Sequence, residues 1–111
     1  MLPENITAIV ARNETWTGHA ATEPYEAGWA REAVIFVRAL KEPKGAVPMA
    51  EVEISPDGMH WIAEGTRITM PAAKDQVVAA RVTGFGNWLR LSADFDQGAE
   101  CTLLVSIHLK A

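Results

Sequence analysis

The chain has 111 residues, 22% of them charged, and a formal net charge of −4. These totals suit one globular domain with its own apolar core. An acidic chain lacks the basic surface that neutralises nucleic-acid phosphates or anionic lipids, so we expect neither a nucleic acid nor a membrane as partner. The single cysteine, Cys101, excludes an internal disulfide and a site of several thiolates.

The first ten residues, MLPENITAIV, lack the basic and then apolar pattern of a signal peptide. No apolar run approaches the roughly 20 residues that a membrane span requires. We therefore expect a protein that is made and folded in the cytoplasm.

Alternation of apolar and polar residues predicts strands along most of the chain. The segment 33–40, AVIFVRAL, is apolar on both faces, which is typical of a strand between two layers or one covered by a neighbouring subunit. The alternative is a helix over 25–42, which is rich in helix-forming residues. The β-branched and aromatic run VIFV favours the strand. In chain order, the predicted strands are 5–12, 33–40, 50–55, 76–84, 88–94 and 101–109.

Two of these strands have well-defined faces. In 88–94, Leu89, Leu91 and Ala93 are expected to face the core. In 101–109, the residues expected to face the core are Cys101, Leu103, Val105, Ile107 and Leu109. Cys101 is thus predicted to be a small buried hydrophobe.

The breaks between strands are turn sequences at the spacing of a sandwich. In SPDG, 55–58, proline and glycine suit a hairpin with a bulge, and Ser55 and Asp57 can accept bonds from nearby amides. Trp61 follows and is expected to cap the core. The sequence predicts an all-β, single-domain, antiparallel β-sandwich over 1–111. We expect it to be jelly-roll-like, with seven or eight strands and with 13–31 as an irregular arm or edge segment.

The sequence shows no motif that points to a reaction. His19, His60 and His108 have no zinc-ligand spacing, and the turn DFDQGAE, 94–100, lacks the ligand pattern of an EF-hand. Serine nucleophile elbows, phosphate-binding glycine loops and Cys–His pairs are missing from the sequence. We expect no enzyme activity, no catalytic residue, no cofactor and no bound metal.

Four tryptophans are more than one core requires. Trp88 is predicted on an outer face beside Arg90, where the guanidinium can stack on the indole. Exposed tryptophan and tyrosine mark sugar platforms or protein–protein contacts, and burial beneath a loop is the other interpretation. The candidates for an interface or a stacking site are Trp16, Tyr25, Trp29, Trp88 and Arg90.

Two elements of the sequence resemble small β-sandwich structural proteins of bacteriophages and prophages, such as decoration, head-fibre and tail-associated proteins. The residues Ser55, Asp57, Gly58 and Trp61 match an S-x-DG-x-x-W hairpin, and the residues Gly86, Trp88, Leu89, Arg90 and Leu91 match a G-x-W-L-R-L strand. The resemblance covers 33–109. Carbohydrate-binding and discoidin-like modules share the same turn and core pattern.

The resemblance implies a non-enzymatic structural subunit, associated with a virion or a related particle. The surplus tryptophan and the two-faced strand favour association with copies of itself, for instance as a trimer, or with a capsid or larger protein shell. The alternative is a carbohydrate-binding module that uses Trp16, Trp29 or Trp88 as stacking platforms.

Overall fold

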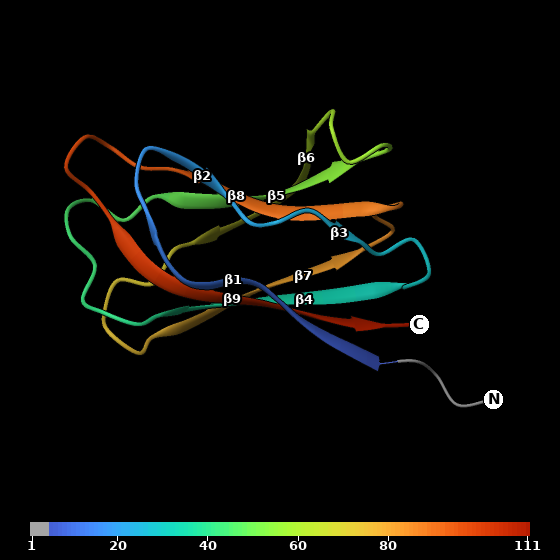
Figure 1. Ribbon diagram of the computed structural model, residues 1–111, viewed down its shortest axis with the longest axis horizontal. Helices are drawn as coiled ribbons and strands as arrows, with labels where there is room; N and C mark the ends of the chain where they lie inside the picture. The colour runs from blue at the N-terminus through green and yellow to red at the C-terminus, as the bar shows by residue number, and fades with distance from the viewer. Residues whose placement is uncertain (1–4) are drawn as a thin grey trace.

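A computed structural model describes residues 5–111 of the chain, which form nine β-strands in two layers (Figure 1). Sheet A has the strand order β1-β9-β4-β7, and sheet B has the order β2-β8-β5-β6, with β3 also paired to β8. All pairs are antiparallel. The strands are β1 (Asn5–Trp16), β2 (His19–Ala21), β3 (Tyr25–Glu26), β4 (Glu32–Ala39), β5 (Met49–Ser55), β6 (Ile62–Thr69), β7 (Val77–Thr83), β8 (Trp88–Asp94) and β9 (Cys101–Lys110).

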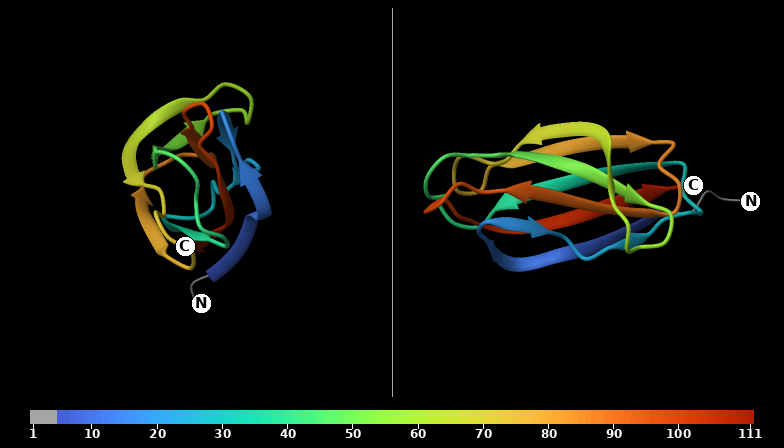
Figure 2. Two further views of the ribbon diagram at one scale, coloured as in Figure 1. Left: turned by 90° about the vertical axis from the view of Figure 1, so that its left-hand side faces the viewer. Right: turned by 90° about the horizontal axis from the view of Figure 1, so that it is seen from above.

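The chain crosses between the two sheets at every connection except β2–β3 and β5–β6, which both stay within sheet B. The short strands β2 and β3 both pair with β8 and act as one interrupted strand. Counted in this way, the fold has eight strands in two four-stranded layers, which is the jelly-roll arrangement. Figure 2 shows the two layers end-on and from above. The predicted all-β sandwich is confirmed.

The core lies between the layers because each strand turns alternate side chains inward. The inward residues of β8 and β9 predicted from the sequence are all buried, and Leu89, Leu91, Leu103, Val105 and Ile107 have no exposed surface. Cys101 is also buried, and burial raises the pKa of its thiol. From β4, the inward residues are Ala33, Ile35, Val37 and Ala39.

The helical alternative for 25–42 is wrong. Residues 32–39 form β4, a central strand that pairs with β9 on one side and with β7 on the other. Two hydrogen-bonded neighbours and an inward row of buried residues outweigh the helix propensity of Ala, Arg and Glu. Within residues 5–111 no helix is long and apolar enough to cross a membrane.

The segment 13–31, predicted as an irregular arm or edge segment, lies against the sandwich as an edge. Its first residues complete β1, and its later ones form β2 and β3 at the margin of sheet B. The amide of Glu23 donates to the carbonyl of Val10, and the amide of Thr22 donates to the carbonyl of Leu91. These bonds tie the segment to both layers.

We expect the substitution Leu91→Ala to lower the free energy of unfolding by about 2–5 kcal/mol, because it leaves a cavity between the sheets. The matched control is Ile62→Ala on β6, where the native side chain is 63% exposed. Urea denaturation of both variants measures the difference. Equal losses from the two substitutions would contradict the assignment of Leu91 to the core.

Candidate functional surfaces

The outer face of sheet A is apolar across its middle. In the sheet register, Phe36 lies between Ser106 and Ala79, and Ser106 in turn lies opposite Ile9. We call this surface the outer patch. Its residues are Ile9, Val34, Phe36, Val77, Ala79 and Leu104, of which Ile9 and Val77 are exposed and the others are half-buried.

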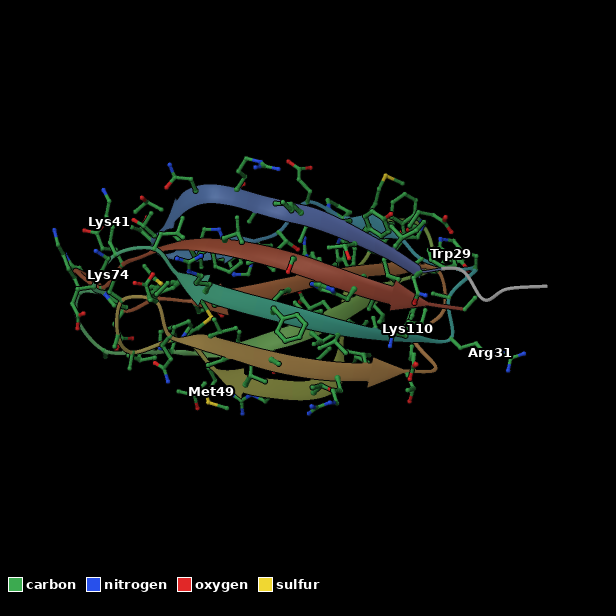
Figure 3. All side chains as sticks on the ribbon, turned by 90° about the horizontal axis from the view of Figure 1, so that it is seen from below. Trp29, Arg31, Lys41, Met49, Lys74 and Lys110 are labelled. Atoms are coloured by element: carbon green, nitrogen blue, oxygen red, sulfur yellow. The ribbon has the colours of Figure 1, made fainter. Side chains whose placement is uncertain are left out.

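Charged groups surround the outer patch. Figure 3 looks onto sheet A and shows Lys41 and Lys74 near one end of the molecule and Arg31 and Lys110 near the other. Beside the patch, the side chain of Arg38 pairs with Asp75 at 2.9 Å. The ring of His108 packs edge-on against Phe36, with 4.9 Å between the ring centroids. An apolar centre with a charged rim is the usual anatomy of a protein interface.

The outer face of sheet B is charged instead. Glu51 pairs with Arg67 across β5 and β6 at 3.5 Å, and Glu53 pairs with Arg90 across β5 and β8 at 2.7 Å. At the far margin, Nδ1 of His19 lies 2.6 Å from a carboxylate oxygen of Asp94. The two outer faces therefore differ in kind: sheet B carries a layer of ion pairs, and sheet A carries an apolar surface.

The predicted stacking of Arg90 on Trp88 is wrong. The Arg90 guanidinium lies over the ring of Trp61, 4.4 Å from its centroid. Trp88 instead lies beneath the hairpin turn at Gly58, where an added Cβ would come within 3.3 Å of the indole. Gly58 also has a positive φ of 81°. Glycine is therefore favoured here for two reasons: it adopts this backbone conformation without strain, and it has no Cβ to crowd the indole.

Trp61 is not the core residue predicted from the sequence. It is half-buried on the outside of sheet B, where the guanidinium of Arg90 lies over its ring. The buried tryptophan is Trp16, which ends β1 opposite Cys101 with 3% of its surface exposed. Its indole N–H donates to the Glu14 carboxylate at 3.1 Å, so the polar end of the ring is satisfied.

The structure does not bring the five predicted site residues together. Trp16 is in the core, and Trp88 and Arg90 are on the outer face of sheet B. Tyr25 and Trp29 lie at the margin between the layers, where both are half-buried and pack on the core. These three residues belong to the edge segment 13–31, in which Trp16 is buried and Tyr25 and Trp29 are half-buried against the core.

The hairpin turn between β5 and β6 is held by two side chains. The hydroxyl oxygen of Ser55 accepts from the amides of Asp57 and Gly58, and one carboxylate oxygen of Asp57 accepts from the amides of Met59 and His60. The other carboxylate oxygen lies 2.6 Å from Nδ1 of His60. The His60 and Met59 amides, with the His60 ring, hold the pKa of Asp57 well below its usual range. The predicted turn is confirmed, with Asp57 as its central acceptor.

The remaining titratable groups are dispersed. Each of the three histidines contacts a different strand or turn: His19 meets Asp94, His60 meets Asp57, and His108 meets Thr7 and Ser106. Within residues 5–111, no three His, Cys, Asp or Glu side chains are placed to hold a metal ion. From the acidic turn 94–100, Glu100 reaches Lys44 at 3.5 Å.

Two of the recesses on the surface adjoin β5 of sheet B. One, of about 470 Å³, is lined mainly by apolar side chains of β5, β6 and the β7–β8 connection: Ile54, Pro56, Ile62 and Phe85. The other, of about 310 Å³, lies between β5, β8 and the segment before β5, and its lining includes Glu51, Arg67, Asp94 and Asp96. In the latter, Glu51 and Arg67 already pair with each other.

None of the outer-patch residues was among the candidates predicted from the sequence. The segment 33–40 is apolar on both faces, and this pattern could have indicated Val34 and Phe36. Only one face of a strand can point into the core, so the apolar residues of the other face must lie outside. Ile9, Leu104 and Ala79 could not be grouped with them, since only the strand order places β1, β9 and β7 beside β4.

Comparison with known proteins identifies a solved structure with a similar fold. No family model matches the chain, and no curated protein matches it significantly. Among solved structures, the crystal structure of the SPBc2 prophage-derived protein YomS is similar, with a TM-score of 0.65 and 8% sequence identity. The likeness covers 100% of this chain and 96% of that one. The two proteins share a fold over their whole length.

The lowered pKa of Asp57 predicts a pH-dependent contribution to stability. Below its ordinary value of 3.8 the unfolded chain takes up a proton before the native chain does, so this contribution is lost as the pH falls. We expect Asp57→Asn to lose less stability than the wild type between pH 5 and pH 3. Asn can still accept the amide bonds of the turn.

Urea midpoints measured across this pH range test the prediction. Asp96→Asn, which removes an exposed aspartate from another turn, is the control and should keep the wild-type pH dependence. Parallel pH profiles for Asp57→Asn and the wild type would show that the turn bonds do not depend on the charge of Asp57.

Proposed function

We propose that this chain is a non-enzymatic structural subunit of a phage or phage-derived particle, and that it joins this assembly through the outer patch of sheet A. The observation that carries the proposal is the apolar outer face of a sheet whose inner face already forms the core. Phe36 lies beside Ala79 of β7, and Leu104 of β9 and Val77 of β7 lie on either side of Arg38, so the apolar side chains of the patch come from three neighbouring strands with polar residues among them.

The composition of the patch supports association. A one-sided antiparallel sheet normally presents polar residues to water, whereas Val34, Phe36 and Leu104 lie on the outside of sheet A. Extended apolar patches on a protein surface usually mark interaction sites. The charged groups nearest the patch carry both signs: Arg38 pairs with Asp75, and Arg81 and Lys110 lie on the same face as Glu32.

The fold gives independent support for the phage context. The sandwich matches, over its whole length, a protein described as prophage-derived. At 8% identity this likeness concerns the fold, and the assignment to a particle is our inference from the fold together with the patch.

A carbohydrate-binding module fits less well. Of the three tryptophans that could have served as stacking platforms, Trp16 is buried and Trp29 packs on the core. One side of the Trp88 ring lies against the turn at Gly58. A sugar platform needs an open indole face, and these contacts take away much of the available surface.

We expect the wild-type chain to sediment with phage or phage-like particles from the strain that carries this gene, and Phe36→Lys to stay with free protein. The substitution places a charge in the centre of the patch, where its burial in an interface is costly. Density-gradient centrifugation of lysates, followed by detection of the tagged chain, measures the distribution.

Ala63→Lys is the matched control, because Ala63 is exposed and lies opposite Glu53 on the outer face of sheet B. This variant should sediment with the particles like the wild type. Recovery of the wild-type chain only at the top of a gradient that contains particles would refute the proposal.

A further inference from the structure

The sandwich has four edges, and three of them carry features that hinder the addition of another strand. At one edge of sheet B, β2 and β3 have only three and two residues. At the other, β6 is broken by an irregularity around Gly65, which has a φ of 117°, and it carries Glu64 and Arg67. At one edge of sheet A, the strand β7 has β6 of sheet B alongside it, which hinders the approach of another strand.

The fourth edge is the first half of β1. From Asn5 to Ile9 this strand pairs with β9 without a register shift. These five residues, NITAI, contain no charge, no proline and no glycine. The second half of β1 differs, because its register shifts twice after Ile9 and the carbonyl of Val10 is already taken by the Glu23 amide. Figure 3 shows β1 at the margin of sheet A.

Both faces of this half-strand expose isoleucine. Ile6 lies opposite Leu109, so it faces the inner side of the sheet, yet 39% of its surface is exposed. Ile9 lies opposite Ser106 on the outer side and is 44% exposed. The second layer therefore covers Ile6 only in part, and the edge keeps apolar surface on both of its faces.

We propose that the 5–9 edge of β1 pairs antiparallel with the same edge of a second copy of the chain, about a two-fold axis near Thr7. The two A sheets then form one continuous eight-stranded sheet. We choose a second copy as the partner because residues 5–9 are uncharged, so two copies of this strand can pair without like-charge repulsion.

The side-chain pattern is self-complementary in this register. With Thr7 opposite Thr7 of the second copy, Ile6 lies opposite Ala8 on the inner side and Asn5 lies opposite Ile9 on the outer side. In this pairing each isoleucine lies beside a smaller residue of the second copy. That neighbouring strand covers the edge of the isoleucine that is exposed in a single copy. The backbone N–H and C=O groups along this edge gain partners from the other strand.

This pairing is separate from the proposed attachment through the outer patch. It joins edges and leaves the outer faces of both sheets free, so the two patches lie on the same side of the joined sheet. The pairing can therefore hold if the chain has another function, and the patch can attach to a particle if the chain is monomeric.

The first experiment compares two lysine substitutions on opposite edges of sheet A. Ile6→Lys introduces two charges close to the two-fold axis, and Thr83→Lys places a charge on the opposite edge strand, β7, at an exposed position outside the outer patch. Sedimentation equilibrium from 5 to 500 μM measures association of the 12.1 kDa chain. We expect dimers for the wild type and Thr83→Lys, and a dissociation constant at least tenfold weaker for Ile6→Lys.

Phe36→Lys distinguishes the two proposals. If it dimerises like the wild type, the purified chain does not use the outer patch to pair with itself. If Phe36→Lys is monomeric while Ile6→Lys is dimeric, the edge proposal is wrong and attachment through the patch stands. A wild-type chain that is monomeric at 500 μM, or a trimer, also overturns the edge pairing.

The second experiment needs no destabilising change. In hydrogen exchange of the wild-type chain, amides of residues 5–9 should become more protected as concentration rises, while those of β7 stay constant. Thr7→Cys should form a disulfide between copies on mild oxidation, and Thr83→Cys on β7 should not. Cys101 is 2% exposed and does not compete. Concentration-dependent protection confined to other strands would refute the pairing.

Discussion

The rest of the structure depends on the burial of the inward side chains of β9 between the two sheets. Its inward residues Leu103, Val105, Ile107 and Leu109 are almost without exposed surface, and both of its edges are paired, to β1 and to β4. Because a one-residue slip would turn this row outward, the register of its neighbours is fixed. That register decides which side chains of β1 and β4 face outward, and so it creates the outer patch.

The outer faces of the two sheets differ in the side chains that they expose. On sheet B, Glu51, Glu53, Arg67 and Arg90 neutralise one another across the strands, and Arg90 also covers Trp61. That face is complete in one copy of the chain. On sheet A the outward residues Val34, Phe36 and Leu104 are apolar and lie among polar or charged neighbours such as Ser106, His108 and Arg38. Covering the apolar side chains with another surface would stabilise them. The proposed function follows from this asymmetry.

The hairpin 56–61 shows how a segment that looks like a binding loop can be structural. Ser55 and Asp57 satisfy its amides, and Gly58 allows the turn to lie on Trp88. The tryptophans that suggested a ligand platform are thus used to hold the turn and the edge segment. Association through sheet surfaces and edges is our proposal, and it is argued from the exposed apolar residues.

Six of the nine strands, β1, β4, β5, β7, β8 and β9, could be predicted from the sequence, as could most turns and the inward rows of β8 and β9, because period-two alternation and turn residues are local properties. The apolar character of both faces of β4 was also visible there. The strands β2, β3 and β6 were not predicted, and neither were the burial of Trp16 and the contact of Arg90 with Trp61. The strand order places Ile9, Phe36 and Leu104 on one surface and turns the partly exposed Ile6 inward. These outcomes depend on which strands become neighbours, and that choice is made by packing between residues far apart in the chain.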